Sequence, residues 1–332
     1  MAARGSKDDR GEGGDSASSS SGSRGDRAAA LRLFLEARGP LVESALSENL
    51  PPSSLRPEGL HRAMRLAALS GGKRVRPLLA LATGELLGMR SPEKLLPFAC
   101  AIEYVHTCSL VLDDLPCMDD ADLRRGEKTL HRATSESTAI LAANALLMRA
   151  FELVAATARS VSLSRGEAED LVAGLAATVG SAGMIGGQFV DLEPPAGEGG
   201  PDDEKRELER LEFVHARKTG SLFTYALGGA ATLARANTAE KEALVAYAKN
   251  VGLAFQIVDD VLDAEGDPAL TGKDARRDAA LRRTTFVSLA TAAGAKSIAA
   301  DLIETAKASL ALFRGRGAVL AGFADYVRDR RR

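Results

Sequence analysis

The sequence has no tryptophan and few residues that bind soft metals, with three cysteines and four histidines in 332 residues. Without tryptophan, and with aromatic residues at 4%, stacking on nucleic-acid bases has little support. The net charge of −2 gives no electrostatic reason for binding a polyanion. Cys100, Cys108 and Cys117 are odd in number and lack CxxC spacing, so they indicate reduced thiols and suggest neither a disulfide framework nor a zinc site. We therefore expect a cytoplasmic protein that does not bind nucleic acid.

The N-terminal segment has almost no apolar residues that a core could bury. It consists of Gly, Ser and charged residues, and it lacks the apolar stretch of a secretory signal. We predict a disordered tail over residues 1–27 and one domain over residues 28–332. A plastid transit peptide is the alternative, but such peptides are poor in acids, and this segment contains Asp8, Asp9, Glu12, Asp15 and Asp26.

One stretch has the length of a membrane span. Leu171–Val190 contains no charged residue. It does contain five glycines, together with Ser, Thr and Gln. This composition favours close helix packing in a soluble core, and we expect no stable insertion into a membrane.

From residue 28 onward the pattern is helical. Ala and Leu dominate, and runs with alternating β-branched residues are absent. Clusters of Pro and Gly separate the apolar stretches. The predicted fold class is all-α, a large helical bundle with helices at 28–48, 57–70, 73–87, 92–115, 135–158, 167–191, 203–216, 220–234, 239–264, 284–292 and 295–313.

Two acid-rich segments lie within this apolar pattern. Residues 100–123 hold six acids and residues 250–272 hold five, and neither segment contains Lys or Arg. In the second segment, Asp259 and Asp263 are one turn apart and share a helix face. In the first segment, Asp113 and Asp119 are out of register on a regular helix. A kink or helix end at Pro116 could bring Asp119 back toward Asp113.

Carboxylates gathered next to Val, Leu and Ile repel one another and are poorly solvated. A bound cation removes both problems. Because the ligands are all oxygen, with no His or Cys in register, they favour a hard ion such as Mg²⁺ or Mn²⁺. A solvated acidic surface would also explain one such cluster, but it accounts less well for two clusters that each follow an apolar run.

Several basic residues near glycine could bind a phosphate. Gly71 and Gly72 precede a predicted helix start that places Lys73 and Arg76 on one face, where backbone N–H groups also face an anion. Taken singly, each base is explained as well by a solvated surface position. The further candidates are Arg124, Arg125, Lys218, Lys273, and Gln188 with Asp191; for this last pair, binding and close packing at Gly186–Gly187 are equally good explanations.

These motifs, in this order, resemble the trans-prenyltransferase (polyprenyl diphosphate synthase) family from about residue 30 to the C-terminus. The family's two aspartate-rich motifs match Asp113-Asp114-x4-Asp119 and Asp259-Asp260-x2-Asp263. The other matches are Gly72-Lys73-Arg74-x-Arg76-Pro77, Leu123-Arg124-Arg125-Gly126, Gly187-Gln188-x2-Asp191 and Lys218-Thr219-Gly220.

The resemblance implies a bundle around a deep central cavity, usually as a homodimer. It implies that an allylic diphosphate (dimethylallyl, geranyl or farnesyl) binds three Mg²⁺ ions, with Mn²⁺ as an alternative, through Asp113, Asp114, Asp119, Asp191, Asp259, Asp260 and Asp263. Arg124, Lys218 and Lys273 would hold this diphosphate. Lys73, Arg76, His106 and Arg125 would hold isopentenyl diphosphate. Gln188, Asp191 and Thr219 would support the reacting end, and the residues implied to be catalytic are Asp113, Asp119, Asp259, Lys218, Gln188 and Thr219.

The sequence departs from the family pattern at a few positions. Leu112 replaces a frequent His, Ala121 interrupts a run of Asp, Asn144 replaces an Asp, and Arg283 replaces a Lys. The metal-binding positions are intact, so we predict activity.

Product length in this family depends on the residues one turn before the first motif. Cys108 and Ser109 are small, so a growing tail could pass them by about one more turn, ~5 Å, before reaching Tyr104. This favours the C20 product geranylgeranyl diphosphate over C15 farnesyl diphosphate. Three different kinds of protein compete with a synthase: a non-catalytic modulatory subunit, a cyclising terpene synthase, and a purely structural helical protein.

Overall fold

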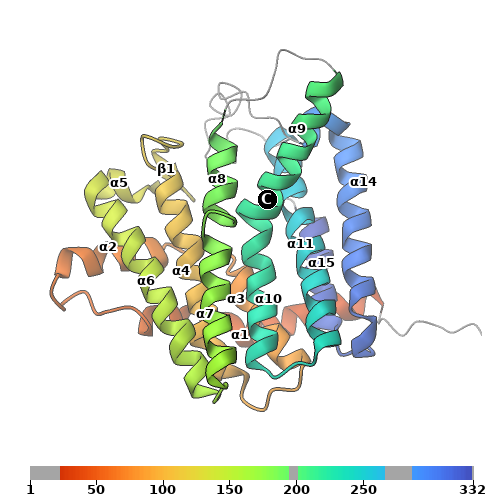
Figure 1. Cartoon of the computed structure of the whole chain (residues 1–332), viewed down its shortest axis with the longest axis horizontal. Coiled ribbons are helices and arrows are strands. Elements are labelled where there is room, and N and C mark those ends of the chain that lie inside the picture. Colours follow the sequence, from red (N-terminus) through yellow and green to blue (C-terminus); the bar gives the residue numbers. More distant parts are fainter. Residues whose placement is uncertain (1–22, 194–200, 266–285, 331–332) are drawn as a thin grey trace, which may run out of the picture.

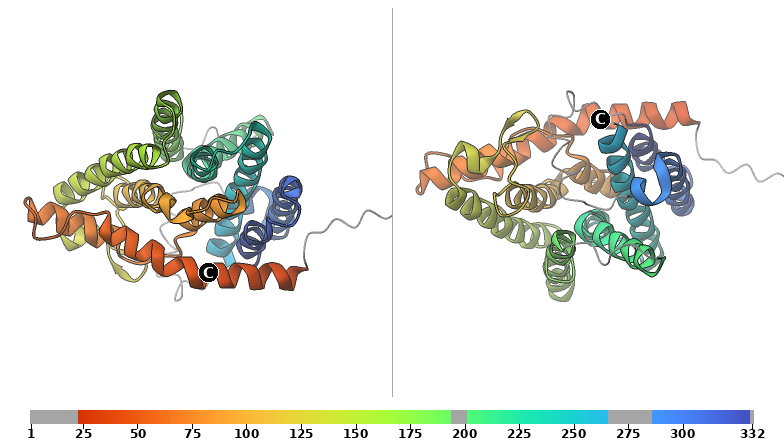
Figure 2. Two further views of the ribbon diagram at one scale, coloured as in Figure 1. Left: turned by 90° about the horizontal axis from the view of Figure 1, so that it is seen from below. Right: turned by 90° about the horizontal axis from the view of Figure 1, so that it is seen from above.

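The computed structural model describes residues 23–193, 201–265 and 286–330. It is an all-α bundle, as predicted (Figure 1). Most helices run roughly along the bundle, while α1 crosses one side of it (Figure 2). The helices are α1 (Arg24–Glu48), α2 (Glu58–Ala68), α3 (Val75–Leu86), α4 (Leu96–Asp113), α5 (Leu130–Ala133), α6 (Glu136–Ser160), α7 (Arg165–Val179), α8 (Met184–Leu192), α9 (Pro201–Val214), α10 (Ser221–Leu233), α11 (Thr238–Glu265), α14 (Phe286–Ser309) and α15 (Ala318–Asp329).

Shorter elements join these helices. They are two 3₁₀ turns at Pro92–Leu95 and Ala311–Phe313, a π-helix at His215–Gly220, and an antiparallel hairpin of β1 (Leu123–Arg124) and β2 (Glu127–Lys128).

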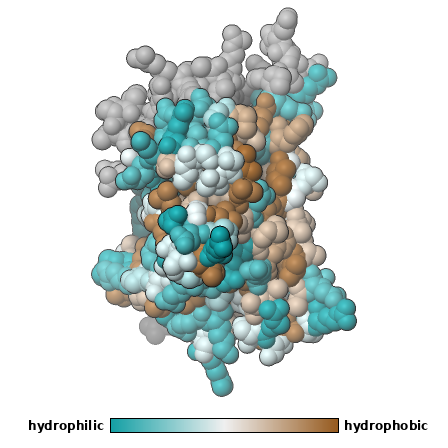
Figure 3. Space-filling view, turned by 90° about the vertical axis from the view of Figure 1, so that its left-hand side faces the viewer, coloured by the Kyte–Doolittle hydropathy of each residue, from teal (hydrophilic) through white to brown (hydrophobic). Residues whose placement is uncertain are grey.

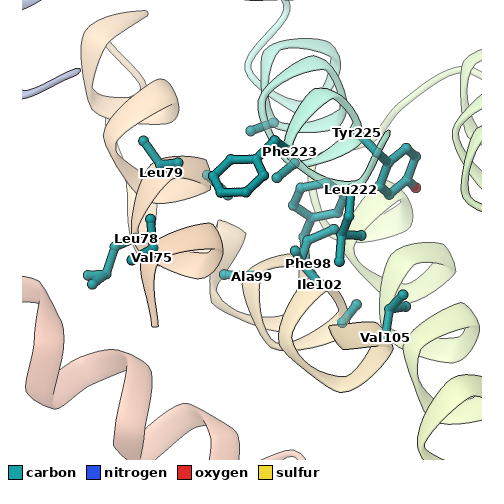
Figure 4. Packing of buried hydrophobic residues seen from close by; sticks show 14 of the residues in the cluster. Val75, Leu78, Leu79, Phe98, Ala99, Ile102, Val105, Leu222, Phe223 and Tyr225 are labelled. Atoms are coloured by element: carbon teal, nitrogen blue, oxygen red, sulfur yellow. The ribbon is translucent and has the colours of Figure 1, made fainter. Parts of the chain in front are cut away.

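The core is centred on α4, which is apolar nearly all round and is therefore enclosed. Phe98 and Ile102 of α4 pack with Leu79 of α3 and Phe223 of α10 (Figure 4). Tyr104 is fully buried, and its hydroxyl donates to the Leu46 carbonyl at 2.6 Å. Because α4 leads directly into the first aspartate motif, this core fixes the position of that motif.

The first helix begins earlier than predicted. Ser23 caps α1, since its hydroxyl accepts from the Asp26 N–H while the Asp26 carboxylate accepts from the Ser23 N–H. The first helix therefore starts four residues before the predicted residue 28. Residues 1–22 lie outside the described residues, and the predicted tail stays a prediction.

The predicted helix 167–191 is two helices. It breaks between α7 and α8, where Gly180 and Gly183 have non-helical backbone conformations. A Cβ atom at Gly183 would lie 2.0 Å from the Thr178 carbonyl oxygen. Glycine is thus required at the break, which re-aims α8 and the residues that it carries.

Three further features differ from the prediction. The sequence pattern did not predict the hairpin, the short α5 or α15. The predicted helices 284–292 and 295–313 form one element, α14, that is kinked at Thr291. The other predicted helices are confirmed to within a few residues.

Three helical stretches are long and apolar enough to cross a membrane, judged by length and composition only: Pro92–Asp113, Glu136–Ser160 and Arg165–Leu192. The fold covers them unequally, because 67% of the apolar window is buried in the first stretch but 39% and 33% in the other two. Much of the apolar surface of α6 and of α7–α8 therefore faces outward.

Candidate functional site

The elements that carry the described candidate residues meet at one end of the bundle, the upper end in Figure 1. The end of α4, the hairpin, α8, the π-helix and the last turns of α11 lie there. The π-helix contacts both α8 and α11, which joins the Gln188 motif to the second aspartate motif.

The first aspartate motif is built by the end of a helix. α4 ends at Asp113, and the chain then turns so that the Asp119 N–H donates to the Asp113 carbonyl at 2.9 Å. Asp120 takes a left-handed conformation in this turn. The prediction that Asp119 returns toward Asp113 is confirmed, and a helix end is the cause.

Asp114 already has a cationic partner. Arg124 of β1 donates to both carboxylate oxygens of the buried Asp114, at 2.6–2.9 Å. The hairpin that the sequence pattern did not predict is therefore what positions Arg124. The assignment of Asp114 to metal and of Arg124 to a diphosphate stays a prediction, and it requires this ion pair to be shared or opened.

Asp113 is electrostatically strained. Burial raises the pKa of its carboxyl to about 6, and the nearby Asp119 adds to this, while Lys218 opposes it. A cation at this carboxylate would relieve the strain.

The second motif lies within a continuous helix. In α11, Asp260 accepts a hydrogen bond from the Gln256 amide at 3.1 Å and one from the Phe286 N–H at 3.3 Å. Burial raises the pKa of Asp260 to about 6. The His215 Nε2 atom is 3.9 Å from an Asp260 oxygen, and burial lowers the pKa of His215 to about 4, so the ring is neutral. Asp263, one turn after Asp259, is exposed.

Asp259 forms an ion pair with Arg330, which directly follows α15. Arg330 is almost fully buried, donates to the Phe255 carbonyl at 2.9 Å, and stacks 3.9 Å over the Phe255 ring centroid. Sequence reasoning missed this residue. Only its position in a basic cluster could have pointed to it.

α8 and the π-helix carry the Gln188 group. The Lys218 amine donates to Asp191 at 2.8 Å, and the Thr219 hydroxyl donates to Gln256 at 2.9 Å. The buried amide N and O atoms of Gln188 have no hydrogen-bond partner. A Cβ atom at Gly187 would lie 2.4 Å from the backbone nitrogen of Lys218. This segment therefore packs closely at its glycine and also carries buried polar groups, so both explanations given for it above apply.

The basic group differs from its predicted geometry. α3 begins at Val75 after a left-handed residue, so Lys73 precedes the helix and does not share a helical face with Arg76. Arg76 lies 4.5 Å over the Phe223 ring, and its Nε atom is buried without a partner. Burial lowers the pKa of Arg76 to about 10.

Arg125 reaches this group from the hairpin. It donates to the Gly71 carbonyl, and a Cβ atom at Gly72 would lie 2.6 Å from its guanidinium. Burial, followed by repulsion from Arg76 and Arg125, lowers the pKa of His106 well below its ordinary value. The structure therefore brings Arg76, His106 and Arg125 together as predicted.

The remaining predicted residues have simple positions. Cys108 is buried and Ser109 is half-buried on α4, one turn before the motif. Asn144 is exposed on α6 and donates to the Ile140 carbonyl of its own helix. The Asn that replaces the family's Asp at this position therefore does not place an amide in the site. Leu112 packs against the core. Lys273 and Arg283 lie outside the described residues.

The donor atoms fit a hard metal ion that arrives with a phosphate. Within the described parts of the chain, no three His, Cys, Asp or Glu side chains are gathered closely enough to hold a metal by themselves. Mg²⁺ usually takes one or two carboxylates and completes its shell with phosphate and water. The carboxylates of Asp114, Asp191 and Asp259 each already attract a protein cation.

Comparison with known proteins shows the family of the chain. The family model described as polyprenyl synthetase matches residues 57–311. The chain is 38% identical to a chloroplastic geranylgeranyl pyrophosphate synthase of Capsicum annuum over 89% of this chain and 78% of that one. It is 39% identical to a farnesyl diphosphate synthase of Geobacillus stearothermophilus over 90% and 97%. A solved FPP/GFPP synthase from Zymomonas mobilis superposes with a TM-score of 0.78 at 34% identity, covering 91% of this chain and 99% of that one. The chain is therefore a member of the polyprenyl synthetase family, a short-chain trans-prenyltransferase.

Proposed function

We propose that the protein is a Mg²⁺-dependent synthase that condenses isopentenyl diphosphate with allylic diphosphates to give geranylgeranyl diphosphate. The observation that carries the proposal is the meeting of two strained carboxyl clusters with buried cations. Asp113 and Asp260 have pKa values raised by burial to about 6. Gln188 and Arg76 carry buried polar atoms that lack partners. A diphosphate with its metal ions would complement both sets.

Different residues of the chain would then bind the two substrates. Arg124 and Lys218 would hold the allylic diphosphate, and Arg76 and Arg125 would hold isopentenyl diphosphate. Bound Mg²⁺ would stabilise the negative charge that develops as the allylic C–O bond breaks. The enclosed apolar wall of α4 would exclude water from the allylic cation. The Gln188 amide on α8 would orient the reacting end.

The proposed C20 product rests on the wall formed by α4. Cys108 is small and buried one turn before Asp113, and Tyr104, one turn further, is held rigidly by its bond to Leu46. A tail could therefore extend past Cys108 and stop near Tyr104. Replacing Cys108 with Phe should shorten the main product by one isoprene unit, measured by chromatography of the dephosphorylated prenols. An unchanged product would show that this wall does not limit the chain length, and the C15 product would then be equally supported.

The direct test is incubation with labelled isopentenyl diphosphate, each allylic primer and Mg²⁺, with and without EDTA. We expect Mg²⁺-dependent incorporation and a C20 product. A folded protein that incorporates nothing with any primer would overturn the proposal and favour a non-catalytic subunit of a prenyltransferase.

We also propose a homodimer, formed through the outer face of α6. Leu141 and Met148 are exposed there one above the other, and Leu66 of α2 borders the same side. Apolar residues form a band among polar ones on this side of the molecule (Figure 3). A groove of about 440 Å³ lies between α2 and α6. A second copy would cover these side chains, and a monomer in sedimentation equilibrium at micromolar concentration would reject the proposal.

A further inference from the structure

Glu103 is a buried carboxylate that the function proposed above does not use. It lies on α4, is 3% exposed, and accepts a hydrogen bond from the Arg74 guanidinium at 2.8 Å. His106 follows three residues later in the same helix. Glu103 and His106 therefore face the same side of α4.

Arg74 links Glu103 to the chain segment that presents those residues. Its guanidinium is buried and also donates to Glu43 at 2.8 Å and to the Ala68 carbonyl at 3.0 Å. Its backbone is left-handed, with φ of 48°, and α3 starts at the next residue. The conformation of Arg74 thus sets the direction in which α3 begins and in which Arg76 projects.

Glu103 also acts on the neighbouring cations. Burial lowers the pKa of both Arg76 and Arg125, and the attraction of Glu103 is the largest influence that opposes this. Glu43 has no comparable influence on Arg76. Both carboxylates bind Arg74 and both attract Arg125, Glu103 more strongly, but only Glu103 is among the main influences on Arg76.

Guanidinium groups that are crowded in a poorly solvated site repel one another and tend to turn toward water. A buried carboxylate behind them offsets this repulsion and leaves their free N–H groups directed at an incoming anion. We propose that Glu103 is a positioning residue for isopentenyl diphosphate, holding Arg74, Arg76 and Arg125 in a binding arrangement before this substrate arrives. This inference rests on the proposed prenyl diphosphate synthase function.

The test is steady-state kinetics of Glu103→Gln, with isopentenyl diphosphate and the allylic primer varied separately. We expect the KM for isopentenyl diphosphate to rise about tenfold, while the KM for the primer stays within about twofold and kcat falls less than threefold. A calorimetric titration with isopentenyl diphosphate should show the same loss of affinity. If removing the charge instead tightens binding, Glu103 merely opposes the anion, and the inference is wrong.

Glu43→Gln is the matched control, because it removes the other carboxylate partner of Arg74. We expect it to leave the KM for isopentenyl diphosphate within about twofold. An equal rise in both variants would show that anchoring of Arg74 alone is responsible, which would overturn the inference. If Glu103→Gln does not fold, Glu103→Asp is the substitute, because it keeps the negative charge but moves it away from the arginines by one methylene group. An unchanged KM for isopentenyl diphosphate in this variant would also overturn the inference. Inactivity of the wild-type protein with all primers would instead reject the proposed function.

Discussion

The two aspartate motifs gather similar carboxylates by different structural means. The first motif lies at the end of α4, where a tight turn returns Asp119 to Asp113 through backbone hydrogen bonds. The second lies inside the continuous α11, where helical spacing alone aligns Asp259 and Asp263. The first motif is thus shaped by its own backbone, and the second by a regular helix.

Their cationic partners differ in the same way. Asp114 pairs with Arg124 on the hairpin that directly follows the motif. Asp259 pairs with Arg330, which α15 brings from the far end of the sequence. The geometry of the first motif is therefore largely a local property, whereas the environment of the second depends on how α15 packs. The following predictions test how far this difference reaches.

The largest effect should be the same for both motifs. Asp113→Ala and Asp259→Ala should each lower kcat/KM by roughly 10³-fold, because each removes a carboxylate proposed to hold a metal ion at the leaving diphosphate. Labelled isopentenyl diphosphate incorporation measures this. Asp301→Ala, at an exposed position of α14, is the control and should match the wild type. Full activity in either site variant would mean that only one motif serves the reaction.

Stability should separate the two motifs. Asp114→Asn breaks a buried ion pair and leaves the Arg124 charge poorly compensated, so it should cost about 2 kcal/mol, less than a fully buried pair because Arg124 is one-third exposed. Asp260→Asn removes a carboxylate that burial already disfavours and should change the free energy of unfolding by less than about 1 kcal/mol. Urea denaturation in EDTA measures both, and a larger loss at Asp260 would reverse the comparison.

This contrast also explains how much the sequence could predict. The spacing of Asp259 and Asp263 and the return of Asp119 follow from local geometry, and the structure confirms them. Arg330 and His215 act through tertiary contacts, so no spacing rule reveals them. Gln256 could have been found, since it precedes Asp260 by one helical turn.

The errors in the fold have related causes. The break between α7 and α8 depends on glycines that a helix also tolerates, and only their close contacts with neighbouring carbonyl groups decide between the two structures. The hairpin is too short to show an alternating pattern. The position of Lys73 was predicted wrongly because the left-handed Arg74, which is held by the buried Glu103, delays the start of α3.

Metal affinity should reveal the tertiary partner of the second motif. In the ligand-free protein the Arg330 guanidinium lies against Asp259, where it competes with a metal ion for the carboxylate. Arg330→Gln should therefore bind Mn²⁺ with pyrophosphate about fivefold more tightly, or about 1 kcal/mol, measured by electron paramagnetic resonance titration. Arg328→Gln is the control, because Arg328 pairs with Asp325 and Asp329 on α15. Weaker Mn²⁺ binding in Arg330→Gln would show that Arg330 supports the metal site.

The smallest effect is a pH dependence that the two motifs should share. Burial raises the pKa of Asp113 and Asp260 from 3.8 to about 6, so between these values the folded protein binds more protons than the unfolded chain. Their contribution to stability is complete below the lower value and is lost as pH rises through about 6. In EDTA, Asp113→Asn and Asp260→Asn should each gain free energy of unfolding relative to the wild type at pH 7.5, and this gain should shrink by pH 5.

Comparing the two single variants makes this prediction a test of the contrast between the motifs. Each carboxyl is disfavoured chiefly by burial, and the neighbouring acids add less, so the sign should not depend on whether a turn or a helix carries the motif. Lys218 opposes the shift at Asp113, and hydrogen bonds from Gln256 and Phe286 oppose it at Asp260. Urea denaturation could show a gain in the free energy of unfolding for only one of the two variants. The carboxyl replaced in the other variant would then be solvated in solution, and the two motifs would differ in environment as well as in construction.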